Sequence, residues 1–168
     1  MISVIDLVGA GDVPPPPRTA EPDPLREPDA LREAQLLDCR VSPSDSTIAL
    51  LFELRTAPRF DEGNAALLVV RGLRSFGWDA GTGPGPSTAM TVLSGVPGRL
   101  DDLVRAEFSF HPETRLEVLG ERACFYVLDV EGAGGVPAGH SEGETEHGRG
   151  LPPSWESPCT VLQASGAG

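Results

Sequence analysis

Apolar and polar residues alternate along several short stretches in the middle of the chain. The stretch LLDCRV (36–41) is followed by the turn sequence SPSD and then by TIALLFELR (47–55). A period of two is typical of strands that bury one face, and proline in the second position of SPSD favours a turn. The two stretches therefore predict a hairpin with one apolar face. Its expected pairs are Val41 with Ile48, Cys39 with Leu50 and Leu37 with Phe52.

A second hairpin is predicted over VRAEFSFHPETRLEV (104–118). A three-residue loop at 112–114 places Phe110 opposite Leu116 and Phe108 opposite Val118. A four-residue loop would mix apolar and polar residues on each face, so we expect the shorter loop.

Further strands are predicted at AALLVVRGL (65–73), which continues through RSFGWD either extended or as a bulge, at TAMTVLSG (88–95) and at RACFYVLDV (122–130). Together the stretches predict an all-β fold: a single antiparallel β-sandwich or a partly open β-barrel or roll of about seven strands. Asp29 is expected to cap a short helix over 30–34. The apolar strip 2–8 is expected to pair with an edge of the sheet.

The two ends of the chain differ in composition from the middle. Residues 1–33 are a proline-rich segment, and residues 131–168 are a glycine- and glutamate-rich tail. Such compositions bury too little apolar surface to offset the entropy of ordering. We therefore expect one β-rich domain over 34–130 between flexible Pro/Gly-rich segments. Within the tail, residues 151–163 are expected to dock Trp155 back on the domain.

The chain is acidic and contains no lysine. Its formal net charge is −12, and two thirds of that charge lies outside residues 31–130. Because no basic stripe is present to neutralise phosphates, nucleic-acid binding is not expected. A basic protein partner fits the charge. A Walker-type phosphate loop and a Schiff-base lysine are excluded, since both need a primary amine.

Cysteine use and hydropathy indicate the compartment. Three widely spaced cysteines without a Cys-x-x-Cys motif favour a reducing cytoplasm over a disulfide framework. The first residues, MISVIDLVGAGD, lack the basic start of a signal peptide and carry an acid inside their apolar run. Apolar runs such as AALLVV are too short to span a bilayer. We expect a cytoplasmic protein that does not contact membranes.

The polar stretch HSEGETEHGRG (140–150) is the most prominent candidate for a metal site. His140 and His147 flank three glutamates, and on a helix they would share a face. The glycines of the stretch oppose a helix, and structural zinc sites use tighter Cys/His sets, so we interpret it as a solvated tail. The stretch GTGPGPST (81–88) is interpreted as a connector, because its prolines remove N–H donors and a strand follows it. We expect neither a metal nor a cofactor.

Catalysis is an alternative interpretation. Cys124 and His111 are a nucleophile and a base by type, but alternation turns Cys124 into a sheet face, where free cysteines usually pack. The acidic pairs 61–62 and 101–102 lie in predicted loops, and adjacent acids rarely converge on one substrate. In this alternative, a small hydrolase-type enzyme uses His111 and a neighbouring carboxylate.

The run from LREAQLLDCR to GNAALLVVRGLRSFGW (31–78) resembles the opening of small uncharacterised actinobacterial proteins. Their layout is similar to that of β-rich immunity proteins of bacterial toxin systems. The resemblance covers about 34–130, rests on the strand pattern and GNAALLVVRG, and contains no catalytic motif. It implies a binder that blocks a toxin partner and needs no cofactor.

These observations favour a non-enzymatic protein-interaction module of the immunity type. Its contact surface is expected on one face of the sheet. A structural subunit of a larger assembly, whose ends order on assembly, is a third interpretation. The expected contact residues are Glu53, Arg55, Arg71 and Trp78.

Overall fold

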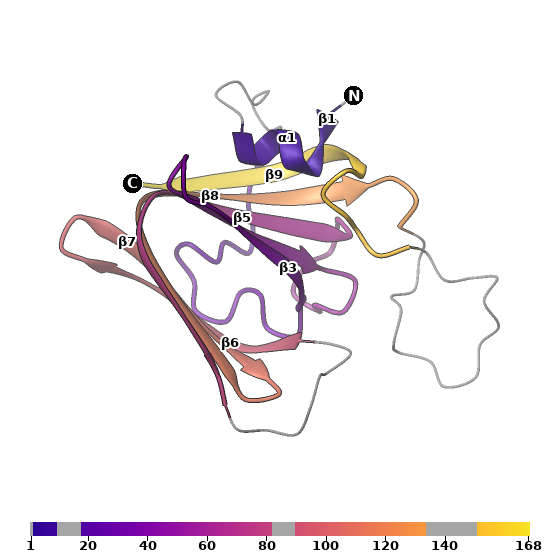
Figure 1. Ribbon diagram of the computed structural model, residues 1–168. Coiled ribbons are helices and arrows are strands. Elements are labelled where there is room, and N and C mark those ends of the chain that lie inside the picture. Colours follow the sequence, from indigo (N-terminus) through magenta and orange to yellow (C-terminus); the bar gives the residue numbers. More distant parts are fainter. Residues whose placement is uncertain (1, 10–17, 82–89, 134–150) are drawn as a thin grey trace.

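The computed structural model describes residues 2–9, 18–81, 90–133 and 151–168 (Figure 1). The alternation is confirmed: these residues form a nine-stranded sheet and a single short helix. In chain order the elements are β1 (Ile2–Ser3), α1 (Val4–Gly9), β2 (Arg18–Thr19), β3 (Gln35–Ser42), β4 (Thr47–Glu53), β5 (Ala65–Ala80), β6 (Met90–Leu100), β7 (Leu103–His111), β8 (Thr114–Val130) and β9 (Pro158–Ala167).

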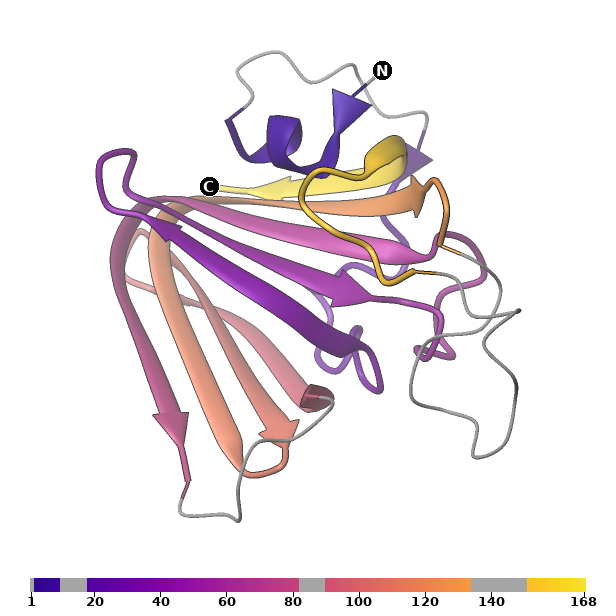
Figure 2. The same ribbon diagram turned by 45° about the vertical axis from the view of Figure 1, so that its right-hand side comes forward.

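Two long strands, β5 and β8, belong to two layers at once. The first half of β5 pairs with β4, and both halves pair with β8. The second half of β8 also pairs with β9, and its first half pairs with β7. A β-bulge follows Leu73, directly after Gly72, whose φ is 62°. A bulge bends a strand, and Figure 2 shows the far halves of β5 and β8 swinging away from β4 and β9.

We call the two layers the upper and the lower layer. The upper layer contains β1, β9, β4, β3 and the near halves of β5 and β8, and the lower layer contains β6, β7 and the far halves, 74–80 and 114–120. Beyond the two shared strands, the layers join where Gln35 and Leu36 pair with Thr91 and Met90. The antiparallel sheet therefore curls into a partly open barrel. Its strand order is β1-β9-β8-β5-β4-β3-β6-β7, with β2 beside β9 and an added β8–β7 pairing.

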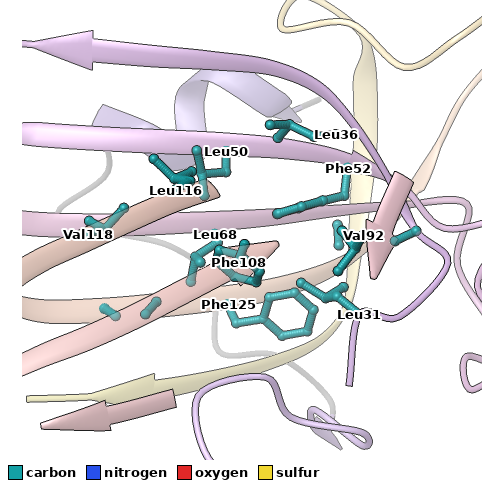
Figure 3. Packing of buried hydrophobic residues seen from close by; sticks show 14 of the residues in the cluster. Leu31, Leu36, Leu50, Phe52, Leu68, Val92, Phe108, Leu116, Val118 and Phe125 are labelled. Atoms are coloured by element: carbon teal, nitrogen blue, oxygen red, sulfur yellow. The ribbon is translucent and has the colours of Figure 1, made fainter. Parts of the chain in front are cut away.

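The larger apolar core fills the space between the layers (Figure 3). Phe52 of the upper layer and Phe108 of the lower layer have ring centroids 5.9 Å apart. The segment 20–34, which precedes β3, adds Leu31 and small alanines to this core. Residues expected to be a flanking segment are thus part of the packing that holds the layers together.

A second apolar cluster covers the outer face of the upper layer. Val4 and Leu7 of α1 are fully buried there, and Trp155 is 3% exposed. They pack over side chains of β4 and β5 such as Leu51 and Leu67. With both faces of the upper layer covered, β4 is buried at every residue.

The expected pairs at the turn end of the β3–β4 hairpin are confirmed. At the other end a β-bulge follows Leu36, so that Leu36 rather than Leu37 lies opposite Phe52. Leu37 packs against the second cluster instead. Two adjacent leucines suit either face, and alternation alone therefore does not locate the bulge.

The predicted register of the β7–β8 hairpin is wrong by two residues. Phe108 pairs with Leu116 rather than Val118, and the loop between paired residues is 111–113. A shift by two leaves every side chain on its expected face, so the apolar pattern fits both registers equally. β8 also continues without a break through 122–130, so the two strands expected in this region form a single strand.

The short helix of the N-terminal region does not lie where the sequence predicted it. Residues 30–34 form turns, and the short helix lies at Val4–Gly9 instead, after Ile2 and Ser3 pair with β9. Asp29 caps no helix: its φ is 58°, and its carboxylate accepts a 3.0 Å hydrogen bond from the N–H of Gly95. Asp29 thereby fastens the turn to β6.

Residues on both sides of 34–130 complete the sheet, since β9 pairs with β8, and β2 pairs with β9. In the part of the chain that the structure describes, no helix has the length and apolar character needed to cross a membrane. The proline run 14–17, most of the stretch GTGPGPST, and His140 and His147 lie outside the described residues.

Candidate functional site

The outer face of the lower layer carries no other described element in Figures 1 and 2. Its side chains stand in rows across the four strands, because paired residues point to the same side. One row is Gly77, Glu117, Glu107 and Val96, and the next is Asp79, Arg115, Ser109 and Ser94. We call the depression along these rows the outer groove, which has a volume of about 540 Å³.

Small residues keep the floor of the outer groove low. Gly77 has no side chain, and a Cβ added there would meet no atom within 4 Å. Ser94 and Ser109 lie in the neighbouring row. Because these residues are short, the charged and apolar side chains around them stand above the floor and are available to a ligand.

Charges at the groove are paired. Glu107 and Glu117 lie directly opposite each other on β7 and β8, an arrangement that is unfavourable for two anions. Arg105 donates to both carboxylates, with 2.6 Å between its Nη2 and Glu117 Oε2. The hydrogen bond from Arg105 holds the pKa of Glu117 below its usual range. Arg105 therefore offsets the repulsion between the two facing acids.

Apolar side chains are exposed around the same layer. Trp78 and Phe76 on β5 are 46% and 47% exposed, and Leu93, Val96 and Leu100 on β6 are about half exposed. Trp78 lies with its ring centroid 6.1 Å from that of the buried Phe110, which holds the indole at the free side of β5. The two groups lie at opposite edges of the lower layer, because β8 and β7 separate β5 from β6. Exposed apolar groups on a folded chain often mark a protein contact surface.

Of the four expected contact residues, Glu53 and Arg55 lie in the interior. Glu53 is 2% exposed and the Arg55 side chain 8% exposed. Arg55 Nε and Nη2 donate to the two carboxylate oxygens of Glu53 over 2.7 Å each. Alternation placed this pair on an outward face, but the second cluster covers that face of β4, so the pair is a buried structural ion pair.

The other two expected contact residues lie apart from this pair and from each other. Arg71 donates from Nη2 to the carbonyl oxygens of Leu7 and Val8, over 3.0 Å each. A cation is favourable at a helix C-terminus, so Arg71 fastens α1 to the sheet. Trp78 alone lies at the outer groove. The four residues do not form one surface.

Sequence reasoning missed Arg105, Glu107 and Glu117 as a group. Alternation does point Arg105 and Glu107 outward, but the expected register set Glu107 opposite Leu119 instead of Glu117. Each strand alone therefore shows which residues point outward, but the expected register separates Glu107 from Glu117. Knowledge of the hairpin register would have revealed the cluster.

A second cleft of about 670 Å³ lies between the 59–62 loop and the segment that contains β2. Its charges are engaged in the fold: Arg18 pairs with Glu62, and Arg59 with Glu27. Hydrogen bonds from Gln163 and Arg18 lower the pKa of Glu62. These contacts hold the N-terminal segment on the sheet, and they leave few free groups for a ligand.

The catalytic alternative finds little support in the described residues. His111 ends β7 and is exposed, and no hydrogen bond or ion pair in that part of the chain joins it to a carboxylate. Among the same residues, no three His, Cys, Asp or Glu side chains are grouped as metal ligands. Burial raises the pKa of the Cys39 and Cys159 thiols to about 11, away from the range of a nucleophile.

We expect the thiols of Cys39 and Cys159 to resist alkylation in the native protein. With a pKa of about 11, about one thiol in a thousand is ionised at pH 8. Iodoacetamide should therefore label both residues about a hundredfold more slowly than in urea. Peptide mass spectrometry over a time course measures the rates. Labelling of either thiol at the rate of the unfolded chain would contradict its interpretation as a packing residue.

Comparison with known proteins leaves the chain without a family. No family model matches it, and no curated protein matches it. A crystal structure of an uncharacterized protein from Neisseria gonorrhoeae is similar, with 12% sequence identity, a TM-score of 0.43, and coverage of 56% of this chain and 90% of that chain. A likeness at that level supports no conclusion about function.

Proposed function

We propose that this protein is a non-enzymatic protein-binding module that binds its partner through the outer groove and its apolar rim. The observation that carries the proposal is the contrast between the layers. The upper layer is covered on both faces, whereas the lower layer has an open outer face on which Val96 is exposed, with Trp78 exposed at the neighbouring free edge of β5. Exposed aromatic and apolar groups around a polar floor are typical of protein interfaces.

The groove suits a protein surface better than a small molecule. It is shallow, crosses four strands, and its ionised groups are paired on the surface rather than converging in an enclosed pocket. Small-molecule sites usually bury most of their ligand in a concave, largely apolar cavity. A polar face that is built from strands and has exposed apolar residues at its rim instead suits an extended contact with another protein.

The narrower form of the proposal is an immunity-type function, in which the partner is a bacterial toxin. The net charge of −12 favours a basic partner, because opposite charges accelerate encounter. At the groove itself the acids Asp79, Glu107 and Glu117 outnumber the cations Arg105 and Arg115. In this form the protein binds and neutralises its partner in the cytoplasm and needs no cofactor.

A substitution on the groove floor tests the proposal. Ser109→Arg adds a long side chain to the middle of the groove, and Thr160→Arg makes the matched change at an exposed position of β9 in the upper layer. We expect the wild type and Thr160→Arg to recover the same partner from the native host. We expect Ser109→Arg to bind that partner at least about tenfold more weakly, as for loss of a hot spot.

The other outcomes separate the alternatives. Equal loss in both variants, or no loss in either, would contradict binding at the groove. Recovery of this protein alone, with a tightly bound small molecule, would favour the enzymatic alternative. A recovered partner that is a toxin, and whose toxicity the protein suppresses, would support the immunity-type form, whereas a large stable assembly would support a structural subunit.

A further inference from the structure

The far half of β5 has a free edge. Pairing with β4 ends at Arg71, so residues 74–80 pair only with β8 in the described chain. The N–H of Gly81 donates to the carbonyl of Glu113 on the β8 side. In an antiparallel ladder these directions alternate. The backbone groups of Phe76, Trp78 and Ala80 therefore point away from β8, toward the open edge.

The middle of this edge, between Arg74 and Asp79, lacks the devices that usually protect one. Edge strands commonly carry lysine, proline or an inward charge that blocks pairing with another chain. Residues 75–78 read Ser-Phe-Gly-Trp, without a charge or a proline. Phe76 and Trp78 are both about half exposed beside the free backbone groups. An open ladder edge next to two exposed aromatic rings favours the addition of a further strand.

The edge is also self-complementary about Gly77. When two copies of an edge strand pair antiparallel around a two-fold axis perpendicular to the sheet, residues equally distant from the axis lie opposite each other. With the axis at Gly77, Phe76 of each copy faces Trp78 of the other, and Ser75 faces Asp79 of the other. Phe76 and Trp78 lie on the same side of β5, so each cross-pair is aromatic with aromatic.

The backbone directions agree with the same register. Phe76 and Trp78 have N–H and C=O groups that point to the edge, so each cross-pair exchanges both of its ladder bonds. Gly77 then meets Gly77 of the second copy as a non-hydrogen-bonded pair, where the two backbones come closest. Side-chain pairing and hydrogen-bond pairing therefore require one and the same alignment.

We infer that two copies of this chain associate through the free edge of β5, antiparallel about Gly77. The lower layers then join into one continuous sheet, and both outer grooves face the same side. The edge shares Gly77, Trp78 and Asp79 with the lining of the outer groove, but Phe76 and Trp78 point to the opposite side of the sheet from Glu117, so the inference does not depend on the function proposed above. It also closes the edge that the chain otherwise leaves open to other strands.

A cysteine at the axis tests the register directly. In Gly77→Cys the new thiols of two copies lie opposite each other, at a Cα separation suited to a disulfide. A Cβ is accommodated at Gly77, because nothing lies within 4 Å of it. The matched control is Gly98→Cys on β6, where an added Cβ likewise meets nothing within 4 Å. The wild type gives the background from the native cysteines.

We expect mild oxidation to convert most of Gly77→Cys to a covalent dimer on a non-reducing gel at micromolar concentration. Gly98→Cys and the wild type should stay at least about tenfold lower, since their thiols do not face each other. Equal cross-linking of the two variants would indicate random collision and overturn the inference. No cross-linking of Gly77→Cys would overturn it as well.

A second measurement removes the edge without a new thiol. Light scattering should give a dimer for the wild type and for Val96→Lys, and a monomer for Phe76→Lys, which sets a charge opposite Trp78 of the second copy. Val96 is as exposed as Phe76 but lies on β6. A monomeric wild type, or a Phe76→Lys dimer, would overturn the inference. If circular dichroism shows that Phe76→Lys does not fold, the comparison of Gly77→Cys with Gly98→Cys still tests the inference.

Discussion

Replacing Trp155 with alanine is expected to lower the free energy of unfolding by about 3–5 kcal/mol. The indole is 3% exposed and belongs to the cluster that covers the outer face of the upper layer. Its Nε1–H donates to Asp38 Oδ2 over 2.6 Å, and the Arg40 guanidinium lies 4.7 Å from the ring centroid. Truncation leaves a large cavity over β4 and β5 and removes the indole hydrogen bond to Asp38.

The effect of Trp155→Ala should extend to α1. The carbonyl of Trp155 accepts a hydrogen bond from the N–H of Ile5, and that of Ser157 accepts one from Val4. A six-residue helix is too short to persist without such contacts. Amide exchange in residues 2–9 should therefore accelerate in the variant more than exchange in the lower layer.

Two variants calibrate the Trp155→Ala result in urea titrations. Trp155→Phe keeps most of the packing and loses the Nε1–H bond, so we expect a loss of about 1–2 kcal/mol. Trp78→Ala truncates the other tryptophan, which is 46% exposed, and should cost about 1 kcal/mol. Equal losses for Trp155→Ala and Trp78→Ala would show that the 151–157 segment does not contribute to the core.

How much of this structure the sequence predicts depends on which interactions decide each feature. The all-β architecture follows from alternation, because a period of two records which side chains share a face. Register within a hairpin is less determined: Phe108 is buried whether it pairs with Leu116 or Val118. The bend of β5 depends on a bulge after Leu73, and a bulge changes the face of every later residue without altering composition.

The candidate site was predictable only in part for the same reason. One sheet face was expected as the contact surface, and Trp78 does lie at the outer groove. Glu53 was assigned outward because alternation says which side of a strand a residue occupies, not what covers that side. The cover is Trp155 and α1, which lie far from β4 in the sequence. Arg105 and Glu117 came together only through a register that alternation does not specify.

Substitutions of Glu53 and Arg55 are expected to have the second large effect on stability. They also distinguish a buried ion pair from an exposed contact pair. Arg55→Met is expected to cost about 3–5 kcal/mol of unfolding free energy, because it leaves the Glu53 carboxylate in the interior without its cation. The backbone N–H of Arg55 still donates to Glu53 Oε1 over 3.0 Å, and one such bond does not replace two from a guanidinium. Glu53→Gln alone should be costly too, since it leaves Arg55 charged beside a neutral amide.

The double variant Glu53→Gln/Arg55→Met should regain most of this loss and lie within about 1–2 kcal/mol of the wild type. Neither side chain then carries an uncompensated charge, and the glutamine oxygen still accepts from the backbone. A double-mutant cycle measured by urea unfolding gives the coupling, expected at about 2–3 kcal/mol. An exposed contact pair behaves differently: each single change would cost under about 1 kcal/mol, with almost no coupling. That outcome would show that Glu53 and Arg55 are exposed, and it would contradict the burial of the outer face of β4.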